Sequence, residues 1–377
     1  MKIKINLITL ILSITVANIV HAKFDGRYYE KRMMDRYPSI MDGDTPIPIF
    51  EFKNEKPVSP QYREEHDLTK FVDYEENFSA LAMKDGKIIF ERYNKDLDSY
   101  PGFHLMGESM TKTLIGSVVG HTLCSGGIDS LDDTAGVYSK SLKNSIYKDI
   151  SIKNLLRMAS GINENRDNEK QYNHMLQNRN EDDSNSQIEI IQSIQDKHSG
   201  QGKKSRYHTL DVAAASILVS ELTGKSAAQI FNDEIFTKMG ASDSFYWWKD
   251  NNDITMGFAG AYMTTRDWAK FGQFINDNIN NKTCLGDFYL SGIENSLSTN
   301  SRNYQDYGYY FWVQDISSSF FEKKPMIVLT GKWGQVMIVD HYNNSVVVLI
   351  SASKNSKYGK KHIWKEVGPA MIKEIAN

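Results

Sequence analysis

A serine and a lysine three positions apart, Ser109 and Lys112, form the pattern in this sequence that is best suited to chemistry. They begin an apolar stretch whose periodicity predicts a helix that a glycine pair ends. Because positions i and i+3 share a helix face, the lysine can hydrogen-bond the serine hydroxyl. Burial would lower the pKa of Lys112 and make it a usable base, and the helix N-terminus offers N–H groups to a developing oxyanion. The pattern predicts a serine nucleophile activated by a lysine.

The same Ser-x-x-Lys spacing also occurs at Ser145 to Lys148 and at Ser351 to Lys354. Ser145 lies in a polar loop, and Ser351 ends a strand-like run with no helix after it. Only Ser109 begins an apolar helix. The spacing leaves a structural alternative open, in which Ser109 caps that helix and its lysine is a solvated residue of the first turn.

Four longer blocks extend the pattern, at residues 107–113, 127–133, 150–161 and 257–272. In order and spacing they resemble the serine β-lactamase-related family, which includes class C β-lactamases, D-Ala-D-Ala peptidases and esterases. The resemblance spans about residues 70–375, and Tyr246-Trp247-Trp248 looks most like the 6-aminohexanoate-dimer hydrolase branch. It implies a serine hydrolase that forms an acyl-enzyme on a small-molecule amide or ester and needs no cofactor.

The resemblance implies a second catalytic element, a tyrosine two residues before an Asn or Ser. Tyr207, ahead of an Ala-rich helical stretch, stands at that place and would carry protons to and from the leaving group. The alternative is a tyrosine that only packs on that helix. Thr209 replaces the family's amide, so Thr209 and His208 are candidate substrate contacts, and a lone histidine is more often structural.

The third element that the resemblance implies is Lys-Thr-Gly on the strand lining the site. Its best counterpart begins at Leu329, which replaces the lysine, although the alignment can slip by one residue. Losing that cation argues against efficient carboxypeptidase or β-lactamase action. Trp333 could offer an apolar wall to a substrate or belong to the core. The oxyanion hole and substrate strand would comprise Ser109, Lys332, Trp333 and Gly334, with Leu329, Thr330 and Gly331 as further candidate contacts.

Strand patterns at both chain ends surround a helical middle, which predicts an α+β fold. We expect an antiparallel sheet flanked by helices, with an inserted, mainly helical domain, as in β-lactamases and transpeptidases. The predicted strands are a hairpin around Asp85-Gly86 within residues 78–93, then 307–313, 326–330, 336–339 and 346–350, with a turn at Asn343-Asn344. The predicted helices include 152–158, 210–222 and 360–375.

We expect four units along the chain, one of which consists of two separate segments. They are a signal peptide (1–22), an N-terminal extended arm (23–75), a discontinuous sheet domain (76–125 and 300–377) and a helical domain (126–299). The polar stretch 163–206 within the helical domain is either a lid or a solvated surface insertion.

The first residues have the composition of a secretory leader. Lys2 and Lys4 precede a mostly apolar run that ends in Val20-His21-Ala22, small residues of the kind a signal peptidase cuts after. A membrane anchor is the alternative, but the run falls short of the ~20 apolar residues that span a bilayer. We expect a periplasmic or secreted protein with no stable membrane span after cleavage. In that compartment Cys124 and Cys284 could pair, or both could be buried thiols.

Composition and missing motifs exclude several classes of protein. The 377 residues carry 44 Lys+Arg against 47 Asp+Glu, a net charge of −3, so a nucleic-acid partner is not expected. The chain has no His-Glu-x-x-His, no Cys-x-x-Cys and no glycine-rich phosphate loop, so neither a metal nor a nucleotide is implied. A nucleophile elbow at Ser109 with His341 or His362 as base remains a weaker alternative. The sequence does not set the oligomeric state.

Together these patterns predict an exported serine hydrolase, similar to 6-aminohexanoate-dimer hydrolases or to esterases. The alternatives are a non-catalytic penicillin-recognising relative, or D-Ala-D-Ala peptidase or β-lactamase activity.

Overall fold

The computed structural model describes residues 49–72, 77–97, 99–163, 186–299, 306–317, 322–351 and 363–376. The predicted signal peptide and residues 164–185, half of segment 163–206, lie outside these residues, so both remain predictions. The strands are β1 (Ile49–Phe52), β2 (Asn77–Lys84), β3 (Lys87–Tyr93), β4 (His104–Met106), β5 (Phe245–Trp248), β6 (Ala261–Thr264), β7 (Leu297–Ser298), β8 (Asp306–Tyr307), β9 (Trp312–Ser317), β10 (Lys323–Thr330), β11 (Val336–Asp340) and β12 (Ser345–Ser351). The helices are α2 (Thr111–Cys124), α3 (Ala135–Tyr138), α4 (Lys140–Lys143), α5 (Ile152–Leu156), α7 (Gln187–Ser193), α8 (Leu210–Thr223), α9 (Ala227–Phe231), α10 (Thr265–Asn280), α11 (Cys284–Glu294) and α13 (Gly368–Ala376).

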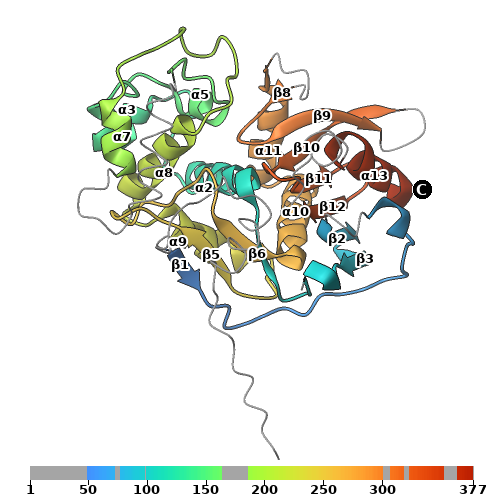
Figure 1. Ribbon diagram of the computed structural model, residues 1–377. Coiled ribbons are helices and arrows are strands. Elements are labelled where there is room, and N and C mark those ends of the chain that lie inside the picture. Colours follow the sequence, from blue (N-terminus) through green and yellow to red (C-terminus); the bar gives the residue numbers. More distant parts are fainter. Residues whose placement is uncertain are drawn as a thin grey trace, which may run out of the picture.

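The larger of two sheets combines both ends of the chain. In the described part of the chain its eight strands follow the order β3-β2-β12-β11-β10-β9-β8-β7, and neighbouring strands are antiparallel. Strand β2 pairs with β12, so Leu81 lies opposite Val348 although the two residues are far apart in sequence. The predicted α+β class, with an antiparallel sheet built from both chain ends, is confirmed (Figure 1).

Two predicted turns of this sheet are present, and their backbone conformations explain why these residue types occur there. Asp85 and Gly86 join β2 to β3 with φ of 50° and 73°, the conformation that an Asp-Gly hairpin turn requires. Between β11 and β12, Asn344 has φ 49°, and Asp340 Oδ1 accepts the backbone N–H groups of Tyr342 and Asn343.

The predicted strand over residues 307–313 is partly wrong. Strand β8 ends at Tyr307 and β9 begins at Trp312, and a tight turn closed by Gly308 N to Phe311 O (2.8 Å) separates them. Tyr310 adopts φ 63° in this turn, and its carbonyl accepts a hydrogen bond from Thr113 Oγ1 at 2.7 Å. The apolar rings of this aromatic run predict a strand, but in the structure they pack in the hydrophobic core around α2.

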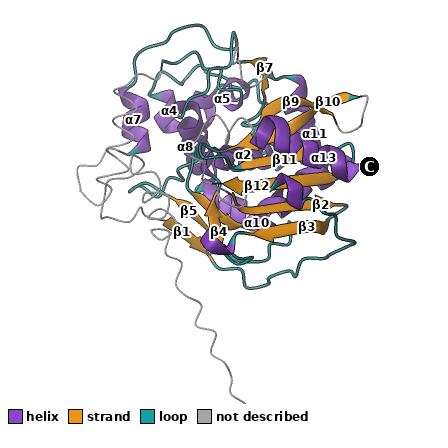
Figure 2. Ribbon diagram, turned by 45° about the vertical axis from the view of Figure 1, so that its right-hand side comes forward, coloured by secondary structure: helices purple, strands orange, loops and turns teal. Residues whose placement is uncertain are grey.

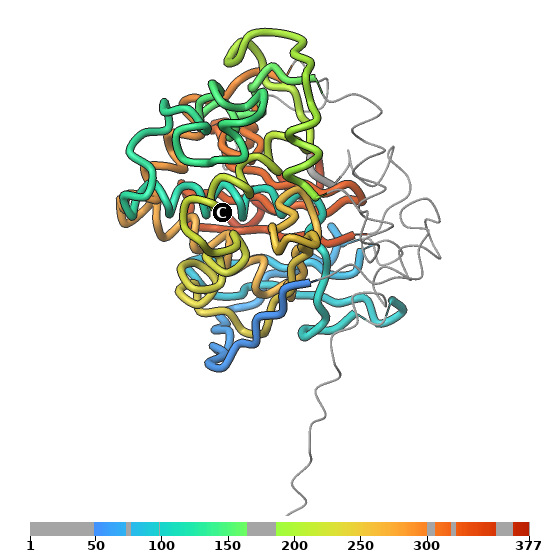
Figure 3. Tube along the Cα trace, turned by 90° about the vertical axis from the view of Figure 1, so that its left-hand side faces the viewer, coloured from blue at the N-terminus to red at the C-terminus, as the bar shows by residue number. Residues whose placement is uncertain are grey.

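A second sheet, which the sequence patterns did not predict, has the order β1-β5-β6-β4. Strand β1 belongs to the predicted extended arm and pairs with β5, as the blue and yellow tubes of Figure 3 show. Strand β4 pairs with β6 and leads directly to Ser109. The segment expected to be mainly helical therefore contributes two strands to this sheet.

Helix α2 lies in the centre of the molecule, between the group of α3, α5, α7 and α8 and the strands β9 to β12 (Figure 1). Small residues allow this crowding, since a Cβ on Gly116 would come within 2.6 Å of the Tyr309 carbonyl oxygen. At its C-terminal end, Cys124 forms a disulfide with Cys284, the first residue of α11, with a Cα–Cα distance of 5.8 Å. Of the two alternatives for these cysteines, the structure has the pair.

Helices cover both faces of the eight-stranded sheet. Helix α10 contacts β2, β11 and β12, whereas α13 contacts β9, β11 and β12. Figure 2 shows α13 in front of the strands and α10 behind them. The predicted domain boundaries remain a prediction. None of the helices in the described ranges is both long and apolar enough to cross a membrane.

Candidate active site

Ser109 lies at a strand–turn–helix junction that leaves it accessible. Strand β4 ends at Met106, and a 3₁₀ helix over Glu108–Met110 then leads into α2. Glu108 has φ 50°, an uncommon backbone conformation for a residue with a side chain. Gly107 packs so closely beneath Trp268 that a Cβ would come within 2.2 Å of that ring. Ser109 is half-buried, whereas its neighbours Glu108 and Met110 are buried, so the turn leaves part of Ser109 exposed to a substrate.

Lys112 is buried beside this hydroxyl, with 4% of its surface exposed. Its Nζ lies 2.9 Å from Ser109 Oγ and 2.7 Å from the carbonyl oxygen of Phe258. Ser109 is not the N-cap of α2, which is Met110, and Lys112 is not solvated. The geometry therefore favours the predicted nucleophile–base pair over the structural alternative. The Phe258 contact was not predicted, although Phe258 belongs to the block 257–272.

Tyr207, the third predicted catalytic residue, also lies beside Ser109. Its phenol shares a hydrogen bond with the Ser109 side chain, and Lys112 Nζ lies 5.1 Å from the centre of its ring. Although 39% of the residue is exposed, desolvation of the phenol raises the pKa of Tyr207 above its usual value. The hydrogen bond with Ser109 lowers this pKa, and the nearby Glu108 carboxylate raises it. The phenol therefore keeps its proton at neutral pH and is able to donate it.

Two aromatic residues of the sheet hold the Tyr207 ring. Trp312, the first residue of β9, stacks on Tyr207 with ring centres 5.2 Å apart and planes inclined by 15°. Tyr307 of β8 meets Tyr207 edge to face at 5.6 Å and Trp312 at 4.7 Å. Neither partner was predicted, because both lie in the run interpreted as one strand. The sheet thus supports a tyrosine that comes from the helical side of the molecule.

The two predicted contacts beside Tyr207 differ in their surroundings. His208 is 6% exposed, and its Nε2 lies 3.0 Å from Asp211 Oδ2. Thr209 is the N-cap of α8 and makes no side-chain capping hydrogen bond. The structure thus pairs His208 with a carboxylate of the protein and leaves Thr209 half-buried at the helix start.

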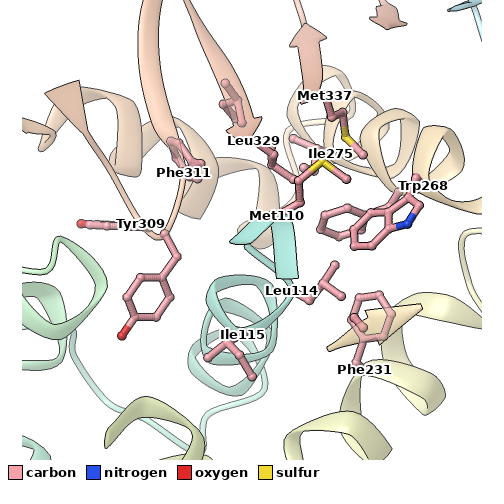
Figure 4. Packing of buried hydrophobic residues seen from close by; sticks show 14 of the residues in the cluster. Met110, Leu114, Ile115, Phe231, Trp268, Ile275, Tyr309, Phe311, Leu329 and Met337 are labelled. Carbon is pink, nitrogen blue, oxygen red and sulfur yellow. The ribbon is translucent and has the colours of Figure 1, made fainter. Parts of the chain in front are cut away.

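Strand β10 contacts the 3₁₀ helix that carries Ser109 and brings the third predicted element to the site. Leu329 is 1% exposed and lies among apolar side chains beside Met110 and Met337, as Figure 4 shows. Thr330 is buried at the end of the strand, and Gly331 begins the turn to β11. The position expected for a substrate-binding cation is therefore part of the hydrophobic core.

The turn between β10 and β11 narrows the choice of oxyanion donor. Gln335 organises it, because its carbonyl oxygen accepts Gly331 N–H at 2.7 Å and its Oε1 accepts Trp333 N–H at 3.0 Å. Gly334 N–H points to Gly331 O at 3.4 Å. No backbone hydrogen bond from Lys332 N–H to another described residue is present. The amides of Trp333 and Gly334 thus have partners within the turn, and the Lys332 amide remains the predicted oxyanion donor. The role of Gln335 was not predicted.

Comparison with known proteins identifies the family. A sequence model described as Beta-lactamase matches residues 78–367, most of the chain. The chain belongs to the Beta-lactamase family. No curated protein shows a significant match to it.

Solved structures share the Beta-lactamase fold with this chain at low sequence identity. A protein assigned as a 6-aminohexanoate-dimer hydrolase from Bacillus anthracis is 17% identical with a TM-score of 0.71, covering 87% of this chain and 91% of its own. A penicillin-binding protein from Bacillus halodurans is 14% identical, with a TM-score of 0.58 and coverage of 80% and 99%. A D-stereospecific amidohydrolase from Streptomyces sp. is 13% identical, with a TM-score of 0.54 and coverage of 73% and 88%. At these identities the likeness concerns the fold.

The nucleophile-elbow alternative finds no support in this Beta-lactamase family site. His341 is buried at the turn between β11 and β12 with its ring against Tyr342, whereas Ser109 is bonded to Lys112 and Tyr207. The other candidate base, residue 362, lies outside the described part of the chain. Within the described ranges no group of three or more His, Cys, Asp or Glu side chains could hold a metal ion.

Proposed function

We propose that this protein is an exported serine hydrolase that cleaves a small-molecule amide or ester through an acyl-enzyme on Ser109. The observation that carries the proposal is the double contact of one hydroxyl. Ser109 Oγ lies 2.9 Å from Lys112 Nζ and also shares a hydrogen bond with the Tyr207 phenol. A nucleophile bonded to both a base and an acid matches the chemistry of acyl transfer.

In the proposed first step the neutral amine of Lys112 takes the proton of Ser109 as Oγ attacks the substrate carbonyl. The N–H groups of Ser109 and Lys332 hold the resulting oxyanion. The carbonyl oxygen of Phe258, 2.7 Å from Nζ, accepts a hydrogen bond from the protonated amine and so orients it. The C–N or C–O bond then breaks, the leaving group takes the phenol proton of Tyr207, and Lys112 restores that proton. A water repeats the sequence on the acyl-enzyme and releases Ser109.

The surroundings of the site support a substrate without a carboxylate at the Lys-Thr-Gly position. Leu329 fills that position and is buried among apolar side chains. Tyr207 is an exposed residue next to the nucleophile, so its ring is available as an apolar surface for the bound molecule. We therefore favour activity similar to that of 6-aminohexanoate-dimer hydrolases or esterases over D-Ala-D-Ala peptidase or β-lactamase activity.

Export is part of the proposal. The leader-like residues 1–22 would direct the chain out of the cytoplasm, and the Cys124–Cys284 disulfide suits an oxidising compartment. We propose a periplasmic or secreted location, which fractionation of cells and N-terminal sequencing of the exported protein would test.

The catalytic proposal is tested by labelling the chain without its leader, residues 23–377, with an activated alkyl phosphonate. We expect a mass increase confined to the peptide that contains Ser109, and turnover of short-chain p-nitrophenyl esters. Ser145→Ala is a matched control, because Ser145 has the same Ser-x-x-Lys spacing but bonds Leu142 O. Turnover that survives Ser109→Ala would overturn the proposal, and neither adduct nor turnover would favour the non-catalytic penicillin-recognising alternative. A panel of esters, linear amides and β-lactams separates the substrate classes.

A further inference from the structure

The segment that carries Tyr207 is held by a buried pair that takes no part in the proposed proton transfers. His208 Nε2 lies 3.0 Å from Asp211 Oδ2, and the two side chains expose 4% and 0% of their surface. A carboxylate is costly to bury unless its oxygens have partners. Asp211 Oδ1 accepts the hydroxyl of Tyr147 at 3.0 Å, and the N–H of Ser160 approaches Oδ2 at 3.4 Å.

The residues on either side of Tyr207 are attached to the same neighbourhood. Arg206 N–H donates to Met158 O at 2.8 Å, and His208 N–H points to Met158 Sδ at 3.4 Å. The helix that follows supplies no side-chain cap of its own, because the Thr209 hydroxyl makes no capping bond. The His208–Asp211 contact therefore replaces a cap in linking the Tyr207 segment to the first turn of α8.

Asp211 also reaches the helix that carries the base. Its backbone carbonyl accepts the hydroxyl of Tyr310 at 2.7 Å, and the carbonyl of Tyr310 accepts Thr113 Oγ1 at 2.7 Å. Thr113 directly follows Lys112 on α2. A continuous set of hydrogen bonds thus connects the segment of Tyr207 with the helix of Lys112, and Asp211 is where the two parts meet.

We propose that Asp211 and His208 are positioning residues that set the place of the Tyr207 phenol relative to Ser109 and the leaving group. The inference rests on the proposed function, because it concerns the proton that Tyr207 delivers. Neither residue touches the reacting atoms. Their effect on the reaction passes through the location of the phenol.

A displaced general acid has a specific kinetic signature. Protonating a leaving group contributes about 10²- to 10⁴-fold to a rate, and a misplacement of about 1 Å can cost about 10²-fold. A p-nitrophenolate leaves without a proton, whereas an alkoxide or an amide nitrogen needs one. We expect Asp211→Asn and His208→Leu to lower kcat/KM, which reports the acylation step alone, for an ethyl ester or an anilide by about 10- to 100-fold. The loss on the p-nitrophenyl ester of the same acid should be much smaller.

The leaving-group comparison separates positioning from loss of folded protein, because partial unfolding lowers both rates equally. Asp267→Asn is the matched control, since Asp267 is also fully buried near the start of a helix but bonds Ser242 and Thr264. We expect it to change thermal stability without changing the ratio of the two rates. Phosphonate labelling of Ser109 counts active sites in every variant.

Combining each change with Tyr207→Phe tests the path of the effect. If Asp211 acts through the phenol, Asp211→Asn adds no further loss once the phenol is gone. A further loss in that background, or equal losses on both esters for Asp211→Asn, would overturn the positioning role. A Tyr207→Phe variant with no leaving-group dependence would instead overturn the proton role in the proposed function, and the inference with it. Normal kinetics of Asp211→Asn beside a leaving-group-dependent Tyr207→Phe would overturn the inference alone.

Discussion

Replacing Gly107 by alanine should disable the nucleophile turn. Gly107 has φ −74°, a conformation open to any residue, so the glycine is needed there for space. An added Cβ would lie 2.2 Å from Trp268 Cζ2, whereas carbon atoms in contact are about 3.5–4.0 Å apart, so the two must separate by more than about 1 Å. Trp268 cannot withdraw freely, because it is fully buried and its Nε1 donates to Leu105 O at 3.1 Å.

The strain should appear in both stability and rate. Overpacking of a core costs about 1–3 kcal/mol, and a shift of about 1 Å at the nucleophile costs about 10²-fold in kcat/KM. Urea unfolding and p-nitrophenyl ester kinetics, normalised by phosphonate titration, measure the two effects. Gly200→Ala is a control, since its added Cβ would meet nothing closer than Lys203 Cε at 3.5 Å. Normal kinetics in Gly107→Ala would refute the claim that this contact sets the position of Ser109.

Three further predictions concern the groups around this site. Trp312→Leu removes the ring stacked on Tyr207 and should lower kcat for alkyl esters by about tenfold at similar KM. An unchanged kcat would show that stacking on Trp312 does not hold the Tyr207 phenol in place. Reducing the Cys124–Cys284 disulfide should lower the free energy of unfolding by roughly 2–5 kcal/mol, measured with urea with and without reductant, and equal values would contradict this. Burial lowers the pKa of His341 to about 4 in the folded protein, so the histidine of the unfolded chain binds a proton more readily. The free energy of unfolding should therefore fall by up to about 3 kcal/mol as the pH drops from about 6.5 to 4. His341→Gln should flatten that pH profile, and an unchanged slope would show that another group causes it.

The site combines three residues at positions that the family resemblance implies with one position that departs from the family pattern. Lys112, Tyr207 and Ser109 occupy the places that the family resemblance implies, yet the strand position expected to hold a lysine is a core leucine. In the proposed function, the residues of acyl transfer are therefore separate from the strand position expected to bind the substrate. The first depends on α2 and the start of α8, and the second on side chains at the end of β10.

Local features were predictable because their physics is local. Ser109 and Lys112 are one helical turn apart, so their contact follows from backbone geometry wherever the helix is buried. The Asp85-Gly86 turn was predictable for the same reason, since its positive φ values need such residues. Tyr207 was predicted from family resemblance, because no local rule brings residue 207 to residue 109.

Contacts between distant segments could not be predicted from pattern. Phe258 offers a backbone carbonyl, which any residue type has, and Trp312 looked like one apolar residue of a longer strand. The Gln335 side chain accepts a hydrogen bond from the Trp333 amide within a tight turn, and the shape of that turn depends on how β10 and β11 pair. The second sheet was missed because β4, β5 and β6 are only three or four residues long, too short for a clear period of two.

The sequence by itself determined the chemistry that is available, namely a serine and a lysine on one helix face, a fold class with strands from both chain ends, and the loss of a lysine at Leu329. Only the tertiary structure decided which groups meet. It brought the Tyr207 phenol to Ser109, placed the Phe258 carbonyl against the lysine and paired Cys124 with Cys284. The physical reason is that spacing along a helix or a strand fixes distances between near neighbours, whereas distances between remote segments depend on how the whole core packs.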